Sequence, residues 1–574
     1  MKTAREIADF LEEYCTLLEL SGADSFRLRA YSNAVRIFEN LEADLEDLIE
    51  RDALTEIKGV GKSVAALVGE YAQTETATAY EKLKAEVPQG LLDMLRVPGL
   101  GPRKIVAIRS ELQIEDLEAL EQACRDGRLD QLKGFGKKTQ ANILKGIEHI
   151  RRYQDRSRVH IARESAVPLL DALRAHPSTQ RVEVAGSLRR RRETVKDIDF
   201  VLSSQDPEAI SEFFTTHESV AEIIQHGQTK SAVRLHNGLQ ADLRVVADDE
   251  FPYILHHFTG SKEHNVELRA RAIDLGLKIN EYGLFRGEER IDCIDETDFL
   301  RALGLDYIPP ELREGLGEIE AAAHGSLPEL VCEQDVRGML HLHSTYSDGA
   351  DSIEAMAQAV QDRGYAYMGM SDHSQSAAYA GGLKVDAVLR QWDEIDALND
   401  KLAPFHIFKG IESDILGDGS LDYEEDILDK FDFVVASVHS QFNLNREAMT
   451  TRIVRAIEHP ATTIVGHLTG RLLLDREGYD VDIDAIIEAA ADKAVSIEIN
   501  AHPARLDIDW RHVKKARDRG VKISVNTDAH RVTGLDYLPY GIGCARKGWL
   551  RREDVLNTLE LDAFRQYLHT RRNT

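Results

Sequence analysis

Two short runs decide the fold of the first half of the chain: Ala185-Gly186-Ser187-Leu188-Arg189-Arg190-Arg191-Arg192 and Asp197-Ile198-Asp199-Phe200-Val201-Leu202. The apolar end of the second run predicts a β-strand, on which residues i and i+2 face the same side about 7 Å apart. Asp197 and Asp199 would then both reach a pair of metal ions about 3.5–4 Å apart. The Gly-Ser turn and the arginines supply donors suited to phosphate.

A third acid strengthens this interpretation. Asp242 lies in Leu239–Val246, a run whose apolar and polar residues alternate as on a half-buried strand. Asp-x-Asp alone is common and is often a solvated strand edge. A Gly-Ser turn about ten residues upstream and a further strand aspartate favour a two-metal site over a solvated edge.

The pattern Gly186-Ser187…Asp197-x-Asp199…Asp242 resembles the palm of the nucleotidyltransferase superfamily. The runs 258–269 (Phe-Thr-Gly-Ser-Lys-Glu-His-Asn-Val-Glu-Leu-Arg) and 276–284 narrow the resemblance to family X DNA polymerases, the family of DNA polymerase beta. It implies that the three aspartates are catalytic and hold two divalent ions, Mg²⁺ or Mn²⁺. It further implies a triphosphate site of Gly186, Ser187 and Arg190, and contacts to the nascent base pair from Gly260, Asn265 and Arg269.

The sequence departs from the family pattern near this site. The family's usual glycine after the paired arginines is Arg191 here, the glycine before the first aspartate is Lys196, and the aromatic before Phe-Thr-Gly is His257. The lysine that forms a Schiff base with an abasic sugar is replaced by Leu67, which is no nucleophile. Deoxyribose-phosphate lyase activity is therefore not expected unless another lysine, such as Lys62, substitutes.

Three G-x-G turns between helical patterns form an internal repeat in the first 150 residues. Two glycines let the backbone approach a phosphate, and the next helix offers free N–H groups and a positive dipole. This is the pattern of the helix-hairpin-helix, which clamps the DNA backbone without reading sequence. The expected DNA-binding residues are Gly59, Gly61, Lys62, Gly99, Gly101, Arg103, Lys104, Gly134, Gly136 and Lys137.

The charge distribution agrees with DNA binding although the net charge is −28. Residues 96–163 carry fifteen Lys and Arg against nine acids, a basic island in an acidic chain. The alternative interpretation of such an island is a set of helix faces exposed to solvent with no binding function. Binding depends on where positive charge lies rather than on the average, and two of the three G-x-G turns fall inside the island.

From residue 337 onward, seven apolar strand candidates alternate with helical patterns, and most end in His, Asp or Glu. Chemistry gathered at the carboxyl ends of parallel strands is typical of a β/α barrel. Imidazoles combined with carboxylates suit zinc, manganese or iron. A single histidine at a strand end is more often a structural hydrogen bonder, but the repetition favours a metal site.

This second half resembles the PHP (polymerase and histidinol phosphatase) family through H-x-H…S-D-G, S-D-H, G-I-E, S-V-H, G-H and D-A-H. The resemblance implies a cluster of about three divalent metals (Mn²⁺, Zn²⁺ or Fe²⁺) and metal-dependent cleavage of phosphoesters. Asp372 would orient one member of the ligand set. The set is His341, His343, Asp348, Asp372, His373, Glu412, His439, His467, Asp528 and His530.

The expected fold is a multidomain α+β and α/β chain in six parts. They are a helical DNA-binding domain (1–80), a fingers-like helical domain with two helix-hairpin-helices (81–150), a nucleotidyltransferase palm with a mixed sheet (151–255), a thumb-like subdomain for the nascent base pair (256–317), a linker (318–336) and a distorted (β/α)7 PHP barrel (337–574). A length of 574 residues and 43% hydrophobic content suit several buried cores.

The leading hypothesis is a gap-filling repair DNA polymerase with a 3′–5′ exonuclease in the PHP half, which could also act as an abasic-site endonuclease or a 3′-end phosphatase. The alternative is a histidinol-phosphatase-like enzyme for small molecules with an accessory DNA-binding module. Expected partners are gapped or nicked DNA and dNTPs, and we expect a monomer. Five scattered cysteines and the lack of a run of about 20 apolar residues predict a cytoplasmic protein without membrane contact.

Overall fold

The computed structural model describes residues 4–23, 25–39, 41, 45–51, 53–74, 76–153 and 155–572. The chain divides into two compact units, Met1–Asp155 and Arg156–Thr574. Within the described residues, none of the helices combines the length and apolarity needed to cross a bilayer.

The first unit is helical, as predicted. Its helices are α1 (Ala4–Leu20), α2 (Ser25–Glu39), α3 (Leu45–Glu50), α4 (Lys62–Thr74), α5 (Thr78–Glu86), α6 (Gln89–Leu95), α7 (Pro102–Leu112), α8 (Leu117–Arg125) and α9 (Lys137–Tyr153). Helix α1 buries Ile7, Leu11 and Leu18, the i, i+4 and i+11 positions of one helical face. Leu67 is buried in the same core, so its side chain serves packing.

The three G-x-G turns have one shared conformation. Their first glycines, Gly59, Gly99 and Gly134, have φ of 97°, 82° and 93°, the left-handed region that favours glycine. The apolar residue between the glycines is buried in each turn. Helices α4, α7 and α9 begin directly after the second glycine, so each turn presents a helix N-terminus.

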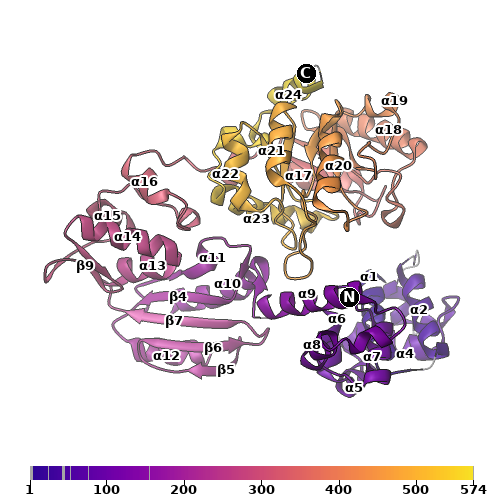
Figure 1. The fold of residues 1–574 in the computed structure, drawn as a ribbon, viewed down its shortest axis with the longest axis horizontal. Helices are drawn as coiled ribbons and strands as arrows, with labels where there is room; N and C mark the ends of the chain where they lie inside the picture. Colours follow the sequence, from indigo (N-terminus) through magenta and orange to yellow (C-terminus); the bar gives the residue numbers. More distant parts are fainter. Residues whose placement is uncertain are drawn as a thin grey trace. The chain divides into compact units, whose positions relative to one another are not determined.

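The predicted palm contains a five-stranded mixed sheet in the order β2-β4-β7-β6-β5, and Figure 1 labels β4, β7, β6 and β5. Its elements are β1 (Ser157–Arg158), α10 (Val159–Ala175), β2 (Arg181–Val184), α11 (Gly186–Arg189), β3 (Thr194–Val195), β4 (Asp197–Ser203), α12 (Pro207–Thr215), β5 (Val220–Gln225), β6 (Lys230–Leu235) and β7 (Gln240–Val246). Strands β4 and β7 pair in parallel. Side chains of α10 and α12 share a core with Ile198 and Phe200 of β4.

The thumb-like region continues into the predicted linker. It contains α13 (Phe251–Thr259), α14 (Lys262–Asp274), β8 (Lys278–Asn280), β9 (Gly283–Arg286), β10 (Glu289–Ile291), α15 (Glu296–Ala302) and α16 (Glu318–Ala323). Helix α16 buries Ile319 and Ala322 against the thumb core. Glu318 is fully buried, accepts hydrogen bonds from the backbone N–H groups of Gly315 and Leu316, and lies 2.7 Å from His264 Nδ1.

The last region is a seven-stranded parallel sheet, β11 to β17, in sequence order. The strands are β11 (Gly338–Leu342), β12 (Tyr367–Met370), β13 (His406–Asp414), β14 (Phe433–Ser437), β15 (Thr462–Val465), β16 (Ser496–Asn500) and β17 (Ile523–Asn526), and the helices are α17 (Ile353–Asp362), α18 (Val385–Leu402), α19 (Glu425–Leu428), α20 (Arg446–Glu458), α21 (Ile483–Asp492), α22 (Trp510–Asp518), α23 (Leu538–Lys547) and α24 (Leu561–Arg572). Figure 1 labels the helices of this region, α17 to α24, in its orange and yellow part. A parallel bridge between Leu342 and Ala529 nearly closes the sheet, which confirms the predicted distorted barrel.

Candidate active sites

The palm aspartates meet at one edge of the parallel strand pair. The register places Asp199 opposite Asp242 and Asp197 opposite Gln240, so Asp199 and Asp242 lie side by side on neighbouring strands and Asp197 lies two residues before Asp199 on the same face of β4. Burial, together with the charges of Asp197 and Asp242, raises the pKa of Asp199 to about 7. Carboxylates that repel one another gain from a bound cation. The donor set therefore fits divalent metal.

Gly186 allows the turn after β2 to approach these acids. Its φ is 62°, and a Cβ added there would lie 2.0 Å from Asp199 Oδ2. The backbone N–H of Ala185 donates to the Asp199 carbonyl oxygen at 2.8 Å. Only glycine fits this position without displacing the aspartate.

Gly186→Ala should reduce nucleotide addition by on the order of 10²-fold, because displacing a catalytic group by about 1 Å has that effect. Addition to a one-nucleotide gap is the measurement. Gly238→Ala is the matched control, since Gly238 has a φ of 86° and open space around its Cβ position. Equal losses in the two variants would show that backbone strain alone is responsible.

The predicted triphosphate residues lie on α11 and its end. Ser187 is in α11, and Arg190 follows it as the C-cap. Arg190 donates from Nη1 to the Thr259 carbonyl oxygen at 2.7 Å and from Nε to Glu314 at 3.0 Å. Arg191, where the family pattern has glycine, has a left-handed backbone with a φ of 54°, and its side chain pairs with Glu311 at 3.3 Å.

The structure brings Gly260, Asn265 and Arg269 together around His257. Asn265 Nδ2 donates to the His257 carbonyl oxygen at 2.8 Å and to that of Gly260 at 3.3 Å. Arg269 Nη2 lies 3.5 Å from His257 Nδ1. A Cβ on Gly260 would lie 2.8 Å from Asn265 Oδ1, so this glycine is also required sterically. Their role in nucleotide selection stays a prediction.

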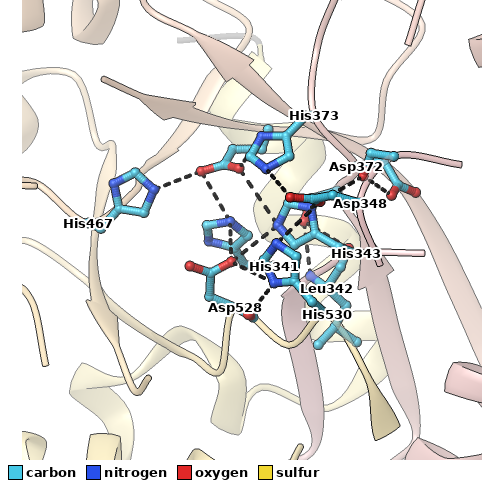
Figure 2. A network of polar contacts seen from close by, with 12 residues as sticks. His341, Leu342, His343, Asp348, Asp372, His373, His467, Asp528 and His530 are labelled. Atoms are coloured by element: carbon cyan, nitrogen blue, oxygen red, sulfur yellow. Dashed lines mark hydrogen bonds and ion pairs between the residues drawn. The ribbon is translucent and has the colours of Figure 1, made fainter. Parts of the chain in front are cut away.

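In the barrel, nine of the ten predicted residues converge, and Figure 2 shows most of them pointing into one space. Glu412 occupies the centre: its carboxylate oxygens lie 2.9 Å from His373 Nδ1, 2.9 Å from His467 Nε2 and 3.3 Å from His341 Nε2. Three groups have ligand atoms close enough to share an ion. They are His343, Asp348, His373 and His530; His341, His343 and Asp528; and His373, Glu412 and His439.

Several buried polar atoms of this cluster have no hydrogen-bond partner among the residues that the structure describes, including His341 Nε2, both ring nitrogens of His343, and Glu412 Oε2. Such atoms are costly unless something binds them. Burial and the neighbouring His530 lower the pKa of His343 to about 3, which leaves its ring neutral, the form that binds metal. His341, His467 and Asp528 also have positive φ, and such strain concentrates at functional sites. The cluster fits a site for several metal ions.

Asp372 lies beside the cluster rather than in any of the three groups (Figure 2). Its carboxylate accepts hydrogen bonds from the Ser344 backbone N–H and hydroxyl at 2.8 and 2.7 Å and from Gln391 at 2.6 Å. These bonds fix the loop after His343, which suits the orienting role predicted for it. Its part in metal binding stays a prediction.

Sequence reasoning missed the carboxylates that orient the histidines. Glu498 Oε1 lies 2.6 Å from His341 Nδ1, and Asp414 Oδ1 lies 2.5 Å from His439 Nδ1. Carboxylate–histidine pairs of this kind fix the ring for metal binding. Glu498 lies in the middle of β16 rather than at its end, so a search for polar residues at strand ends does not single it out.

The predicted DNA-binding residues cluster at the three G-x-G turns of the first unit. Positions where a Cβ would meet nothing include Gly61, Gly99, Gly101, Gly134 and Gly136, so these turns are open to a large partner. Lys104 Nζ donates to the Gly99 carbonyl oxygen at 2.8 Å. The exposed Arg103 side chain pairs with Glu19 at 3.2 Å. Lys62 and Lys137 are the first residues of α4 and α9.

Comparison with known proteins gives a match along nearly the whole chain. DNA polymerase/3′-5′ exonuclease PolX of Bacillus subtilis (strain 168) is 38% identical over 568 residues, 98% of this chain and 99% of that protein. The chain belongs to the PolX family of DNA polymerases. Four family models match parts of this PolX chain: a helix-hairpin-helix domain (2–77), a SAM-like helix-hairpin-helix tandem (91–148), the DNA polymerase beta thumb (254–314) and the PHP domain (339–502).

Other matches cover parts of the chain. A probable phosphatase of Thermoanaerobacter sp. (strain X514) is 28% identical over 241 residues, 40% of this chain and 92% of that protein. The crystal structure of Leishmania infantum polymerase beta, a ternary P/T complex, covers 39% of this chain and 99% of that chain at 20% identity, with a TM-score of 0.26. The PolX assignment does not depend on either of them.

Proposed function

We propose that this PolX chain fills short gaps in DNA with its palm and trims 3′ ends with its PHP barrel. The observation that carries the proposal is the coexistence of two candidate sites. One is the aspartate triad on β4 and β7, and the other is the histidine–carboxylate cluster at the barrel strand ends. The PolX relative carries both activities in its name.

In the palm, Asp197, Asp199 and Asp242 would hold two Mg²⁺ or Mn²⁺ ions. When bound, such ions stabilise the attacking and leaving oxygens of an in-line phosphoryl displacement. Ser187, Arg190 and the N–H groups of α11 would bind the triphosphate of a dNTP. Gly260, Asn265 and Arg269 would face the nascent base pair. The primer 3′-hydroxyl would then attack the α-phosphorus, with pyrophosphate as the leaving group.

In the barrel, the nine converging residues would hold about three ions of Mn²⁺, Zn²⁺ or Fe²⁺, whose chemistry is to activate water and neutralise the phosphate of a DNA end. Glu498 and Asp414 would keep His341 and His439 in the tautomers that bind metal. Removal of one nucleotide at a time from a 3′ terminus follows if the DNA end reaches this cluster. The same metal-dependent hydrolysis of a phosphoester would cleave DNA at an abasic site or remove a 3′-phosphate.

The G-x-G turns would clamp DNA backbone without sequence preference. Four basic side chains lie at the turns: Lys62, Arg103, Lys104 and Lys137. Each phosphate that such a side chain neutralises adds about 0.9 to the slope of log affinity for DNA against log salt concentration. The affinity for DNA should therefore fall about 10²-fold between about 50 and 200 mM salt. Binding to a labelled gapped duplex at several salt concentrations measures the slope. Changing Arg103 and Lys104 to alanine should lower it by about 2. A slope that stays the same would remove these residues from the interface.

The test of both activities uses one substrate, a duplex with a one-nucleotide gap and a labelled upstream primer, in the presence of manganese. Templated addition with dNTPs and a descending ladder without them would support both halves of the proposal. Addition without trimming would leave only the polymerase. A primer unchanged in both reactions would contradict the proposal.

A small-molecule phosphatase is the second candidate, favoured by the similarity of the barrel region to probable phosphatases. The helix-hairpin-helix models in the first unit weigh against it, because a small substrate needs no DNA clamp. Release of phosphate from histidinol phosphate, with no action on the gapped duplex, would favour this candidate.

A further inference from the structure

The carboxylate of Glu314 connects the palm, the end of the thumb and the barrel. Its Oε1 lies 3.0 Å from Arg190 Nε and 2.6 Å from Lys547 Nζ, and its Oε2 lies 3.2 Å from Arg192 Nη1. Arg190 and Arg192 follow α11 of the palm, whereas Lys547 ends α23 of the barrel region. One anion thus holds cations from two catalytic halves, and we call these four residues the Glu314 cluster.

Lys547 is the buried member of the Glu314 cluster from the barrel half, with 1% of its surface exposed. Its Nζ donates to the Arg190 carbonyl oxygen at 3.1 Å as well as to Glu314. It also lies 4.3 Å from the centre of the Trp510 ring. Lys547 therefore contacts the backbone of Arg190 and the carboxylate that pairs with the Arg190 guanidinium.

The charges of the Glu314 cluster are unequal, with three cations around one anion. Burial raises the pKa of Glu314, but Lys547, Arg190 and Arg192 outweigh it and lower that pKa to about 2. Glu314 is thus an anion that must keep cationic partners. If Arg190 turned toward a triphosphate, Lys547 and Arg192 would still neutralise Glu314. Without Lys547, the Glu314 carboxylate would hold the Arg190 guanidinium more strongly.

We propose that Lys547 is a positioning residue for nucleotide addition, which neutralises Glu314 and fixes the Arg190 backbone so that the Arg190 guanidinium is available to the incoming dNTP. This inference rests on the proposed role of Arg190 in triphosphate binding. It gives the barrel half a part in polymerisation that is separate from its own metal cluster.

Lys547→Met should raise the KM for dNTP about tenfold, the size of one charge-assisted hydrogen bond, with kcat and primer trimming unchanged. The methionine keeps most of the volume of the buried chain, which limits disruption of packing. Lys514→Met is the matched control, because Lys514 lies on the neighbouring α22 and pairs with the surface residue Asp518 at 2.9 Å. Its KM should equal that of the unaltered chain. An unchanged KM in a folded Lys547→Met variant would overturn the inference.

Glu314→Gln separates positioning from simple packing. In the double variant Lys547→Met with Glu314→Gln, the neutral amide no longer competes for Arg190, so the KM for dNTP should return toward the unaltered value. Glu314→Gln alone should leave this KM equal or lower, which keeps the inference testable if Lys547→Met does not fold. A raised KM in Glu314→Gln would overturn it.

Arg190→Ala distinguishes this inference from the function on which it rests. A raised KM in Arg190→Ala together with an unchanged KM in Lys547→Met would refute the role of Lys547 and leave Arg190 as a triphosphate ligand. An unchanged KM in Arg190→Ala would remove Arg190 from the triphosphate site, and the role of Lys547 with it. Thermal unfolding of each variant shows whether the barrel and palm remain folded.

Discussion

Changing Asp197 and Asp199 to alanine together should reduce templated nucleotide addition by on the order of 10³-fold or more. Each tenfold loss corresponds to about 1.4 kcal/mol, and a metal pair contributes several kcal/mol to a phosphoryl-transfer transition state. The two side chains share one face of β4, and Asp199 lies opposite Asp242. Asp242 alone would not hold a metal pair. The rate of single-nucleotide addition to a gapped duplex measures the effect.

The same variant should keep its primer trimming, because the barrel cluster is built from other residues. Removing two repelling, half-buried acids should also leave thermal stability equal or higher, since the charge of Asp242 and burial both raise the pKa of Asp197. Low addition would then reflect chemistry rather than unfolding. Addition at the unaltered rate would refute the palm assignment.

Changing His341 and His343 to alanine together should abolish trimming, with a loss again on the order of 10³-fold, while templated addition continues. His343 is a member of two of the three candidate ligand groups, and His341 is within 3.5 Å of both Glu412 and Asp528. The pair therefore supports ions at more than one position. Loss of the labelled 3′ nucleotide in manganese, without dNTPs, is the measurement.

Both histidines are fully buried, so a milder variant is needed beside the double change. Asp348→Asn replaces a predicted ligand whose side chain is 36% exposed and keeps its shape, and it should also lower trimming strongly. Metal content per chain, measured on each purified variant, should fall with trimming. Trimming that persists in variants with reduced metal content would place the nuclease elsewhere in the chain.

The local sequence predicted the candidate catalytic strands well, because the strand pattern and the functional side chains lie within a few consecutive residues. Asp197-Ile198-Asp199 and the strand-end histidines each combine a β-pattern with polar residues at one end of the strand, and the register of β4 on β7 places Asp242 opposite Asp199. The G-x-G turns were equally clear, since a left-handed glycine and a buried middle residue are local requirements.

Partners distant in the sequence could not be predicted in this way. The contact of Glu314 with Lys547 spans 233 residues, and that of Trp510 with Glu193 spans 317 residues. Neither residue has a periodicity or motif that reveals its partner, because such pairs depend on how whole domains pack. The orienting residues Glu498 and Asp414 were missed for a related reason. Each is recognised by the histidine ring that it contacts, His341 or His439, and not by its spacing in the sequence.

The burial of Glu318 has a consequence for the evolution of such two-enzyme chains. The segment between the halves begins inside the thumb. There the Glu318 carboxylate accepts hydrogen bonds from two backbone N–H groups and contacts the buried imidazole of His264. A recombination breakpoint after residue 317 would leave those groups unpaired, at a cost of about 3–5 kcal/mol. Lineages that exchange or lose the barrel should therefore keep the thumb's share of the segment, with breakpoints in the exposed residues 324–326.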